Sequence, residues 1–174
     1  LTGTLRGLER DQLAEQNPVF ARFLPPGKQA KVEPTPGTVY LVSTSAGEVG
    51  VNFSADHLVC DLSTLDSMAQ RLGRVNRFGS GDAQIDLVHQ ESFSKEDLDQ
   101  RRQKTLDFLK TLPKAATGGL DASPMAISTL VALKDAPSLA FAPPPWVVPL
   151  SPEVLDGWTL TTHTEPVSYT HLRA

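Results

Sequence analysis

The segment from Gln70 to Arg77, with the sequence QRLGRVNR, places four long polar or cationic side chains within about two helical turns. Gln70, Arg74 and Arg77 stand at positions i, i+4 and i+7, so a continuous helix would present them on one face, with Arg71 beside them. Arginines so close together repel one another unless an anion lies between them, and planar guanidinium groups fit phosphate oxygens well. We therefore expect an anion-binding helix here; the alternative is a solvated basic turn.

Two apolar runs separated by a polar loop precede this helix. Val39–Val42 and His57–Leu62 are rich in apolar and β-branched residues, which predicts two buried strands of a parallel sheet. The loop Ser43–Gly50 between them is built from small and hydroxyl-bearing residues with two glycines. Because open α/β sheets bind ligands at the carboxyl ends of their strands, we expect this loop and the arginine helix to lie at the same edge of the sheet.

The rest of the chain alternates in the same way before its composition changes. Helices are expected at 7–16, at 94–112 with Ser94 as its cap, and at 124–134 with Ser123 as its cap, and a further strand at 83–89. On the second of these helices, one apolar stripe is expected to contain Leu98, Thr105, Leu106, Leu109 and Leu112. Residues 137–152 hold six prolines and should be extended or looped. They are expected to form a strap packed across the domain, with recruitment of a partner domain as the alternative.

Composition restricts the class of protein. The net charge is −4, so any contact with nucleic acid must be local. Cys60 is the only cysteine and the four histidines are scattered, which leaves no pattern of metal ligands. No run approaches the roughly 20 apolar residues of a membrane span, and no signal peptide is recognisable, so we expect a cytoplasmic protein without a membrane partner.

Two of these segments resemble motifs of the superfamily-2 helicases. Ser43–Asn52, STSAGEVGVN, is similar to motif V, and Gln70–Arg77 is similar to motif VI, in the right order and with a strand between them. Two further sequences resemble the helicase-nuclease of type I CRISPR interference, the type I-U branch most of all. They are VNRFG, at the end of the second motif, and LTGTLRGLERD, at Leu1–Asp11. The resemblance spans roughly residues 1–162, although the diagnostic motifs lie in the first half.

The resemblance implies a fold and a division into parts. It implies an α/β chain, a partial second RecA-like lobe with a mainly parallel sheet, at residues 1–112. A Pro-rich accessory extension would follow at 113–166. Residues 167–174, VSYTHLRA, resemble the translation of a transposon-based sequencing adapter, so we expect a non-native tail rather than a genuine polar terminus.

The resemblance also implies site residues. Arg74 and Arg77 would be arginine fingers for ATP hydrolysis, and Gln70 a contact to the γ-phosphate. Gly50 and Asn52 would lie at the nucleotide, although relatives often carry an acidic residue at the position of Asn52. Thr44 and Arg6 would contact the backbone of nucleic acid.

Several parts of such a helicase do not occur in the sequence. It contains no G-x-x-x-x-G-K-[ST] phosphate loop, no acidic magnesium motif and no His-Asp nuclease motif. The chain also begins at Leu1 rather than Met. We therefore expect a fragment that is inactive alone and that works with a first helicase lobe and an HD nuclease domain. ATP and Mg²⁺, the latter held mainly by that first lobe, would be its cofactors, and single-stranded DNA and a guide-RNA surveillance complex its partners.

Two other functions are compatible with the same residues. The first is a lobe of another superfamily-2 DNA or RNA helicase, since such enzymes share motifs V and VI. The second is a RecA-like module without catalytic activity that only binds protein or nucleic acid. Intact Arg74 and Arg77 favour the catalytic interpretation, because a module without catalysis would not need both.

Overall fold

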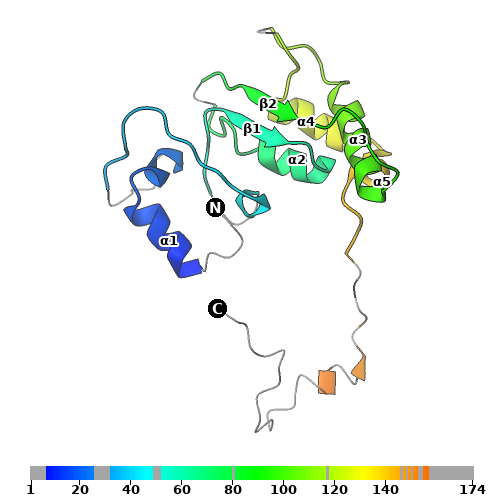
Figure 1. Cartoon of the computed structure of the whole chain (residues 1–174), viewed down its shortest axis with the longest axis horizontal. Helices are drawn as coiled ribbons and strands as arrows, with labels where there is room; N and C mark the ends of the chain where they lie inside the picture. The colour runs from blue at the N-terminus through cyan, green and yellow to red at the C-terminus, as the bar shows by residue number, and fades with distance from the viewer. Residues whose placement is uncertain are drawn as a thin grey trace. The chain divides into compact units, whose positions relative to one another are not determined.

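The computed structural model describes residues 7–25, 32–48, 52–79, 81–116, 118–145, 147, 149, 151–152 and 155–156. The chain forms two compact units, Leu1–Ala142 and Pro143–Ala174. All helices and strands that follow lie in the first unit (Figure 1). Within the predicted Pro-rich strap at 137–152, residues 146, 148 and 150 lie outside the described residues, and so does the whole predicted tail 167–174.

A strand–helix–strand unit forms the centre of the first unit. Strand β1 (Leu58–Asp61) pairs in parallel with β2 (Ile85–Val88), with Leu58 opposite Ile85 and Asp61 opposite Val88. Parallel neighbours need a crossover connection, and here it contains helix α2 (Leu65–Leu72). The two strands predicted at 57–62 and 83–89 are confirmed, and so is their parallel pairing.

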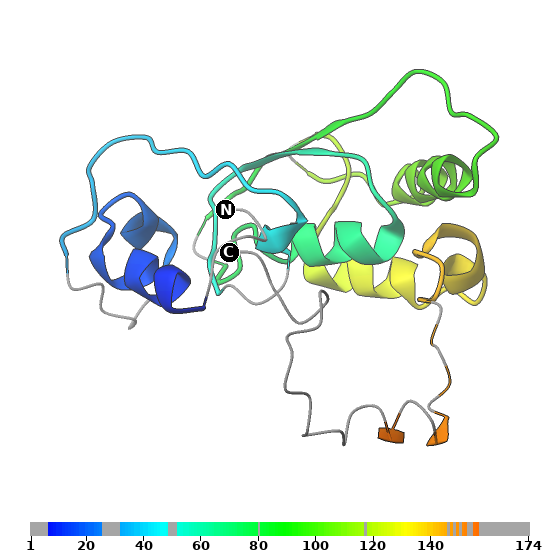
Figure 2. The same ribbon diagram turned by 60° about the horizontal axis from the view of Figure 1, so that its bottom comes forward.

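One face of this sheet is covered by helices. Helix α2 buries Leu65, Met68 and Leu72, which recur at helical spacing along one side. It contacts α4 (Pro124–Val131) and α5 (Ala136–Ala140), and α5 contacts α3 (Asp97–Leu109). Figure 2 shows α2 and α4 running side by side. Alternate strand residues point into this core, namely Leu58, Cys60, Ile85 and Leu87.

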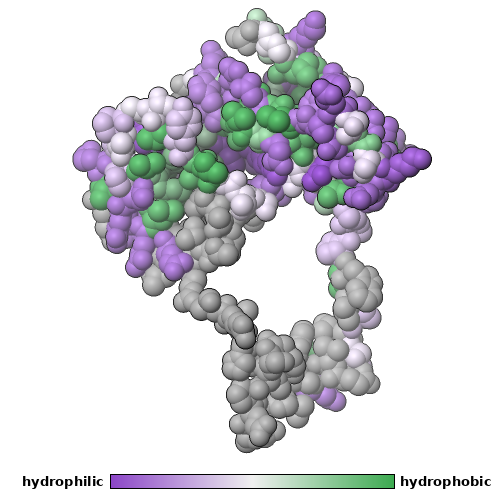
Figure 3. Space-filling view, in the orientation of Figure 1, coloured by the Kyte–Doolittle hydropathy of each residue, from purple (hydrophilic) through white to green (hydrophobic). Residues whose placement is uncertain are grey.

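The opposite face of the sheet is exposed. Val59 and Val88 project from it and are 70% and 59% exposed. Figure 3 shows hydrophobic surface over these strands, next to a mostly hydrophilic surface over α3. The described residues thus build a two-layer arrangement of helices on one side of a small parallel sheet, which fits part of a RecA-like lobe.

One of the two predicted helix caps is found in the structure, and the other is not. Ser123 caps α4 as predicted, because its hydroxyl accepts a hydrogen bond from the N–H of Ala126 over 3.4 Å. Helix α3 begins at Asp97 instead of Ser94, whose hydroxyl accepts from the N–H of Glu96. On α3 the predicted stripe is confirmed at Thr105, Leu106, Leu109 and the following Leu112, whereas Leu98 is 45% exposed.

The packed unit continues past residue 112, the predicted end of the lobe. Helix α5 starts at Ala136, so the prediction of extended chain from 137 is wrong there; Pro137 lies in the first turn, where no backbone N–H is required. Polar contacts hold the end of this segment. Arg101 Nη1 donates to the carbonyl of Phe141 over 2.7 Å, and the N–H of Ala142 donates to Asp66 Oδ1 over 3.0 Å.

The N-terminal part packs through a second cluster. Helix α1 (Gly7–Gln16), which confirms the predicted helix, is followed by the 3₁₀ helix η1 (Phe20–Phe23). Phe20 and Phe23 are buried together with Phe53. The predicted strand at 39–42 is not found: Val39 and Leu41 pack on this cluster, but Tyr40 and Val42 are 84% and 85% exposed. The segment therefore lies on the surface and is not a buried strand.

Candidate functional site

The arginine segment is not one continuous helix. Helix α2 ends at Leu72, and Gly73 is its C-cap, with its N–H bonded to the carbonyls of Ala69 and Arg71. Arg74 and Arg77 follow in an irregular turn in which Asn76 adopts a positive φ of 43°. The prediction that Gln70, Arg74 and Arg77 share a helix face is therefore wrong, because glycine is a weak helix former and the backbone beyond it pairs elsewhere.

That pairing is with the segment following the motif V loop. The N–H of Ala55 donates to the carbonyl of Arg74 over 2.8 Å, and the N–H of Asn76 donates to the carbonyl of Ala55 over 2.7 Å. The N–H of Arg77 donates to the hydroxyl of Ser54 over 3.1 Å. These bonds fix the arginine turn against the chain around Ser54, so the predicted proximity of the two motifs is confirmed.

Arg71 is held by two carboxylates. Its Nε donates to Glu48 Oε1 over 2.8 Å and its Nη1 donates to Asp61 Oδ1 over 2.7 Å. Burial alone would lower the pKa of Arg71, but the hydrogen bond and the charge of Glu48, together with Asp61, raise it above the ordinary value. The guanidinium of Arg71 is thus neutralised by its neighbours.

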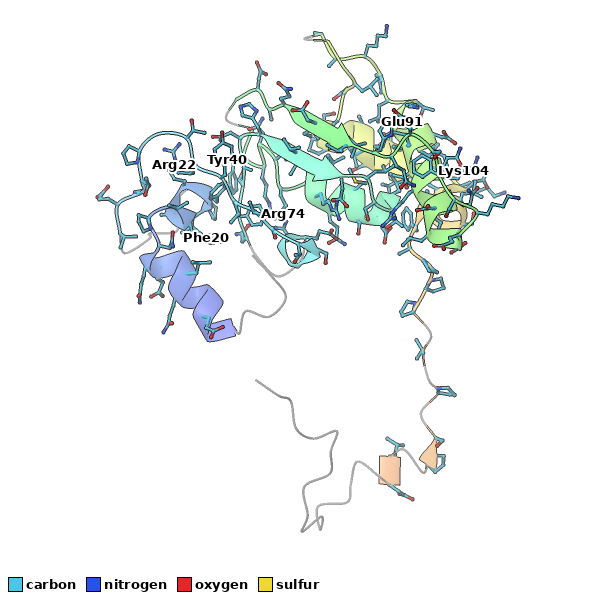
Figure 4. All side chains as sticks on the ribbon, in the orientation of Figure 1. Phe20, Arg22, Tyr40, Arg74, Glu91 and Lys104 are labelled. Atoms are coloured by element: carbon cyan, nitrogen blue, oxygen red, sulfur yellow. The ribbon has the colours of Figure 1, made fainter. Side chains whose placement is uncertain are left out.

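Arg74 is held by neutral groups. Its Nη2 donates to the backbone carbonyl of Glu48 over 2.7 Å, and its guanidinium carbon lies 5.8 Å from the centre of the Phe53 ring, within the range of a cation–π contact. Burial, and then the positive charge of Arg77, lower the pKa of Arg74. Figure 4 shows Arg74 among side chains of the first unit.

Arg77 also has a neutral partner, since its Nη1 donates to Asn52 Oδ1 over 2.9 Å. Within the described part of the chain, neither Arg74 nor Arg77 pairs with a carboxylate. Two guanidinium groups close enough to repel each other, with only neutral acceptors, leave positive charge that an anion such as phosphate can compensate.

Of the other predicted site residues, two are exposed and two lie outside the described residues. Gln70 is exposed on the last turn of α2, and it makes no hydrogen bond to either arginine among the residues described. Thr44 is exposed, and its carbonyl accepts from the N–H of Gly47 across the 3₁₀ turn η2 (Ser45–Gly47). Gly50 and Arg6 lie outside the described residues.

Sequence reasoning missed the role of Glu48. Its side chain is only 12% exposed, and its carboxylate accepts from Ser67 as well as Arg71. The available signal was an acidic residue in an otherwise small and neutral loop, facing a run of arginines.

In the described ranges, no group of three or more metal-ligating side chains comes together, and no helix is both long and apolar enough to cross a membrane.

Comparison with known proteins gives one match. Residues 8–80 match the family model described as CRISPR-associated nuclease/helicase Cas3, C-terminal. Neither a curated protein nor a solved structure matches the chain. The matched stretch contains Glu48, Arg71, Arg74 and Arg77, together with the partners Asn52 and Asp61. This match supports a fragment of the C-terminal part of a Cas3-type CRISPR-associated helicase.

Proposed function

We propose that this chain supplies the second RecA-like lobe of an ATP-dependent single-stranded DNA translocase of type I CRISPR interference, and that Arg74 and Arg77 are its arginine fingers. The observation that carries the proposal is the pair of adjacent guanidinium groups that, among the described residues, bond to neutral acceptors and to no carboxylate. Such groups can leave a carbonyl or an amide for a phosphate oxygen at small cost, because the phosphate adds the attraction between opposite charges to the hydrogen bond.

The chemistry proposed for these residues is electrostatic. Phosphoryl transfer spreads negative charge over the equatorial oxygens of the γ-phosphate, and an arginine finger that meets this charge contributes about 10³ to 10⁵ in rate. ATP would be bound by a first lobe. Arg74 and Arg77 would then reach it only when the two lobes close, which couples closure to hydrolysis.

Other residues have supporting roles in the proposal. Gln70 would contact the γ-phosphate from the end of α2, and Asn52 and Gly50 would lie near the nucleotide. The described residues offer no carboxylate cluster for Mg²⁺, so we propose that the first lobe holds it. Thr44 and Arg6 would contact the backbone of single-stranded DNA, while a guide-RNA complex exposes that strand and an HD nuclease domain cuts it.

The test is steady-state ATP turnover of the complete helicase at saturating single-stranded DNA. Arg74→Ala and Arg77→Ala should each lower kcat by about 10³-fold or more, with DNA affinity nearly unchanged. The matched control is Arg22→Ala, which removes the same charge from an exposed position on η1. A loss of DNA affinity as steep as the loss of turnover would contradict the assignment of fingers.

A further inference from the structure

Carboxylates hold Arg71 on α2, whereas neutral groups hold Arg74 and Arg77 in the turn that follows. Glu48 takes part in both kinds of contact. Glu48 uses its carboxylate for α2, where Oε1 accepts from Arg71 Nε over 2.8 Å and Oε2 accepts from Ser67 Oγ over 3.0 Å. It uses its backbone carbonyl for Arg74, whose Nη2 donates to it over 2.7 Å. The end of the motif V loop is thereby fixed to both α2 and the arginine turn.

The two carboxylates that hold Arg71 are not equivalent. The side chain of Glu48 is 12% exposed, whereas that of Asp61 is 78% exposed. An exposed ion pair contributes about 0–1 kcal/mol and is screened by salt, so Asp61 adds little to the position of Arg71. Asp61 also has fewer contacts with the arginines than Glu48 does, because it bonds to Arg71 and not to Arg74.

This difference in partners has a chemical consequence for Arg74. If the Glu48 carboxylate were free, Arg74 would be a cation near an unpaired acid, and an ion pair could replace its bond to the neutral carbonyl. Because the ion pair would add the attraction of opposite charges to the hydrogen bond, that exchange would hold Arg74 back from phosphate. Arg71 occupies the carboxylate and so prevents it.

We propose that Glu48 is a positioning residue for Arg74 and that Arg71 is the structural cation that keeps the Glu48 carboxylate away from it. The role of Arg74 in ATP hydrolysis rests on the proposed function. The way in which Glu48 and Arg71 position Arg74 does not depend on it. The proposal assigns Arg71 a role different from that of Arg74 and Arg77, although the three share one motif.

The first experiment tests how Arg74 is held and uses the 174-residue chain without nucleotide. Side-chain ¹⁵N–¹H spectra, with the arginine signals assigned from single Arg→Lys variants, should show that Glu48→Gln shifts the signals of both Arg71 and Arg74. Asp61→Asn, the matched control, should shift only that of Arg71. An unchanged Arg74 signal in a folded Glu48→Gln chain would overturn the proposal.

The second experiment measures turnover of the complete helicase. Glu48→Gln should lower kcat on the order of tenfold to a hundredfold, since a misplacement of about 1 Å can cost that much, and should leave KM for ATP almost unchanged. Asp61→Asn should change kcat by less than about fivefold, as expected for an exposed pair. Equal effects of the two variants would contradict the special role of Glu48.

Two double variants distinguish positioning from simple loss of structure. In an Arg74→Ala background Glu48→Gln should have no further effect on kcat, whereas an additional tenfold loss would mean that Glu48 does not act through Arg74. Arg71→Gln should reduce turnover, and adding Glu48→Gln should recover part of it, because no free carboxylate then competes for Arg74. If Arg74→Ala itself leaves turnover unchanged, the proposed function is wrong. The spectra of the first experiment would still show whether Glu48 positions Arg74.

Discussion

The guanidinium of Arg77 donates a hydrogen bond to Oδ1 of Asn52 over 2.9 Å, which joins two residues 25 positions apart in the sequence. An acidic residue in place of Asn52 would form an ion pair with Arg77. The amide instead leaves the charge of Arg77 uncompensated, as the carbonyl of Glu48 does for Arg74. The sequence therefore carries neutral groups at both points where a carboxylate would compete with phosphate.

Asn52→Asp should weaken the binding of tripolyphosphate to the 174-residue chain. A new negative charge a few ångströms from the anion costs about 1 kcal/mol in water, or roughly fivefold in Kd. Calorimetric titration at low ionic strength measures the change, which should shrink as salt is added. Asn52→Ser, which stays neutral, is the control, and equal affinity of the Asp and Asn chains would argue against an anion site at Arg77.

Asn76 should tolerate glycine but not valine. Its φ of 43° lies in the left-handed region, which asparagine and glycine adopt readily and a β-branched residue does not. Asn76→Val should destabilise the chain by about 1–3 kcal/mol, and Asn76→Gly by clearly less, in urea unfolding. The side-chain bond to the carbonyl of Gly81 is lost in both variants, so it cancels in the comparison. Equal stabilities would show that the turn is not strained by its backbone angle.

The central elements could be predicted because their signals are local. β1 and β2 follow from short apolar runs, and α4 follows from a serine cap and a proline in the first turn. The motifs predicted that the loop and the arginines lie together, and the bonds of Glu48 to Arg74 and of Asn52 to Arg77 confirm it.

The remainder depends on contacts between distant segments. Spacing alone favoured a helix through Arg77, but backbone bonds between Ala55 and the residues on either side of Val75 replace its helical bonds. Similarly, α5 forms where Ala136 and Ala140 fit the core against α2 and α3, which no local pattern among the prolines indicated. The roles proposed for Gln70, Thr44, Gly50 and Arg6 stay predictions.

Asp66 should make the chain sensitive to acid. Burial alone would raise the pKa of its carboxyl, but hydrogen bonds from Thr64 and from the backbone N–H groups of Ala142, Asp66 and Ser67 outweigh burial and lower it. A lowered pKa in the folded state stabilises the fold above the unfolded pKa of about 4, and this contribution is lost as pH falls through the folded value.

Asp66→Asn should therefore lower Tm at pH 7, and its difference from the unsubstituted chain should begin to shrink below about pH 4 and disappear as pH falls through the lowered pKa of the folded state. Thermal unfolding followed between pH 3 and pH 7 measures it. Asp107→Asn, which alters an exposed pair with Lys104, should change Tm little throughout. A difference at Asp66 that is independent of pH would mean that its charge does not contribute.

The 174-residue chain by itself should hydrolyse no ATP above background. Its sequence contains no phosphate loop and its described residues offer no cluster for Mg²⁺, so Arg74 and Arg77 would have no bound triphosphate to stabilise. Phosphate release measured at several chain concentrations tests this, with the complete helicase as the positive control. Turnover that rises with chain concentration and is abolished by Arg74→Ala would contradict the proposed dependence on a first lobe.

The complete helicase should be stimulated by single-stranded DNA and weakly or not at all by RNA. The family match to a CRISPR-associated nuclease/helicase favours DNA, because guide pairing exposes a DNA strand that the motor needs to grip only by its backbone. ATP turnover with DNA and RNA oligonucleotides of matched sequence is the measurement. Stimulation should not depend on base sequence and should weaken as salt rises, and Thr44→Val should reduce it through the loss of a phosphate contact. Equal or greater stimulation by RNA would favour an RNA helicase, and no turnover with either would favour a RecA-like module that only binds.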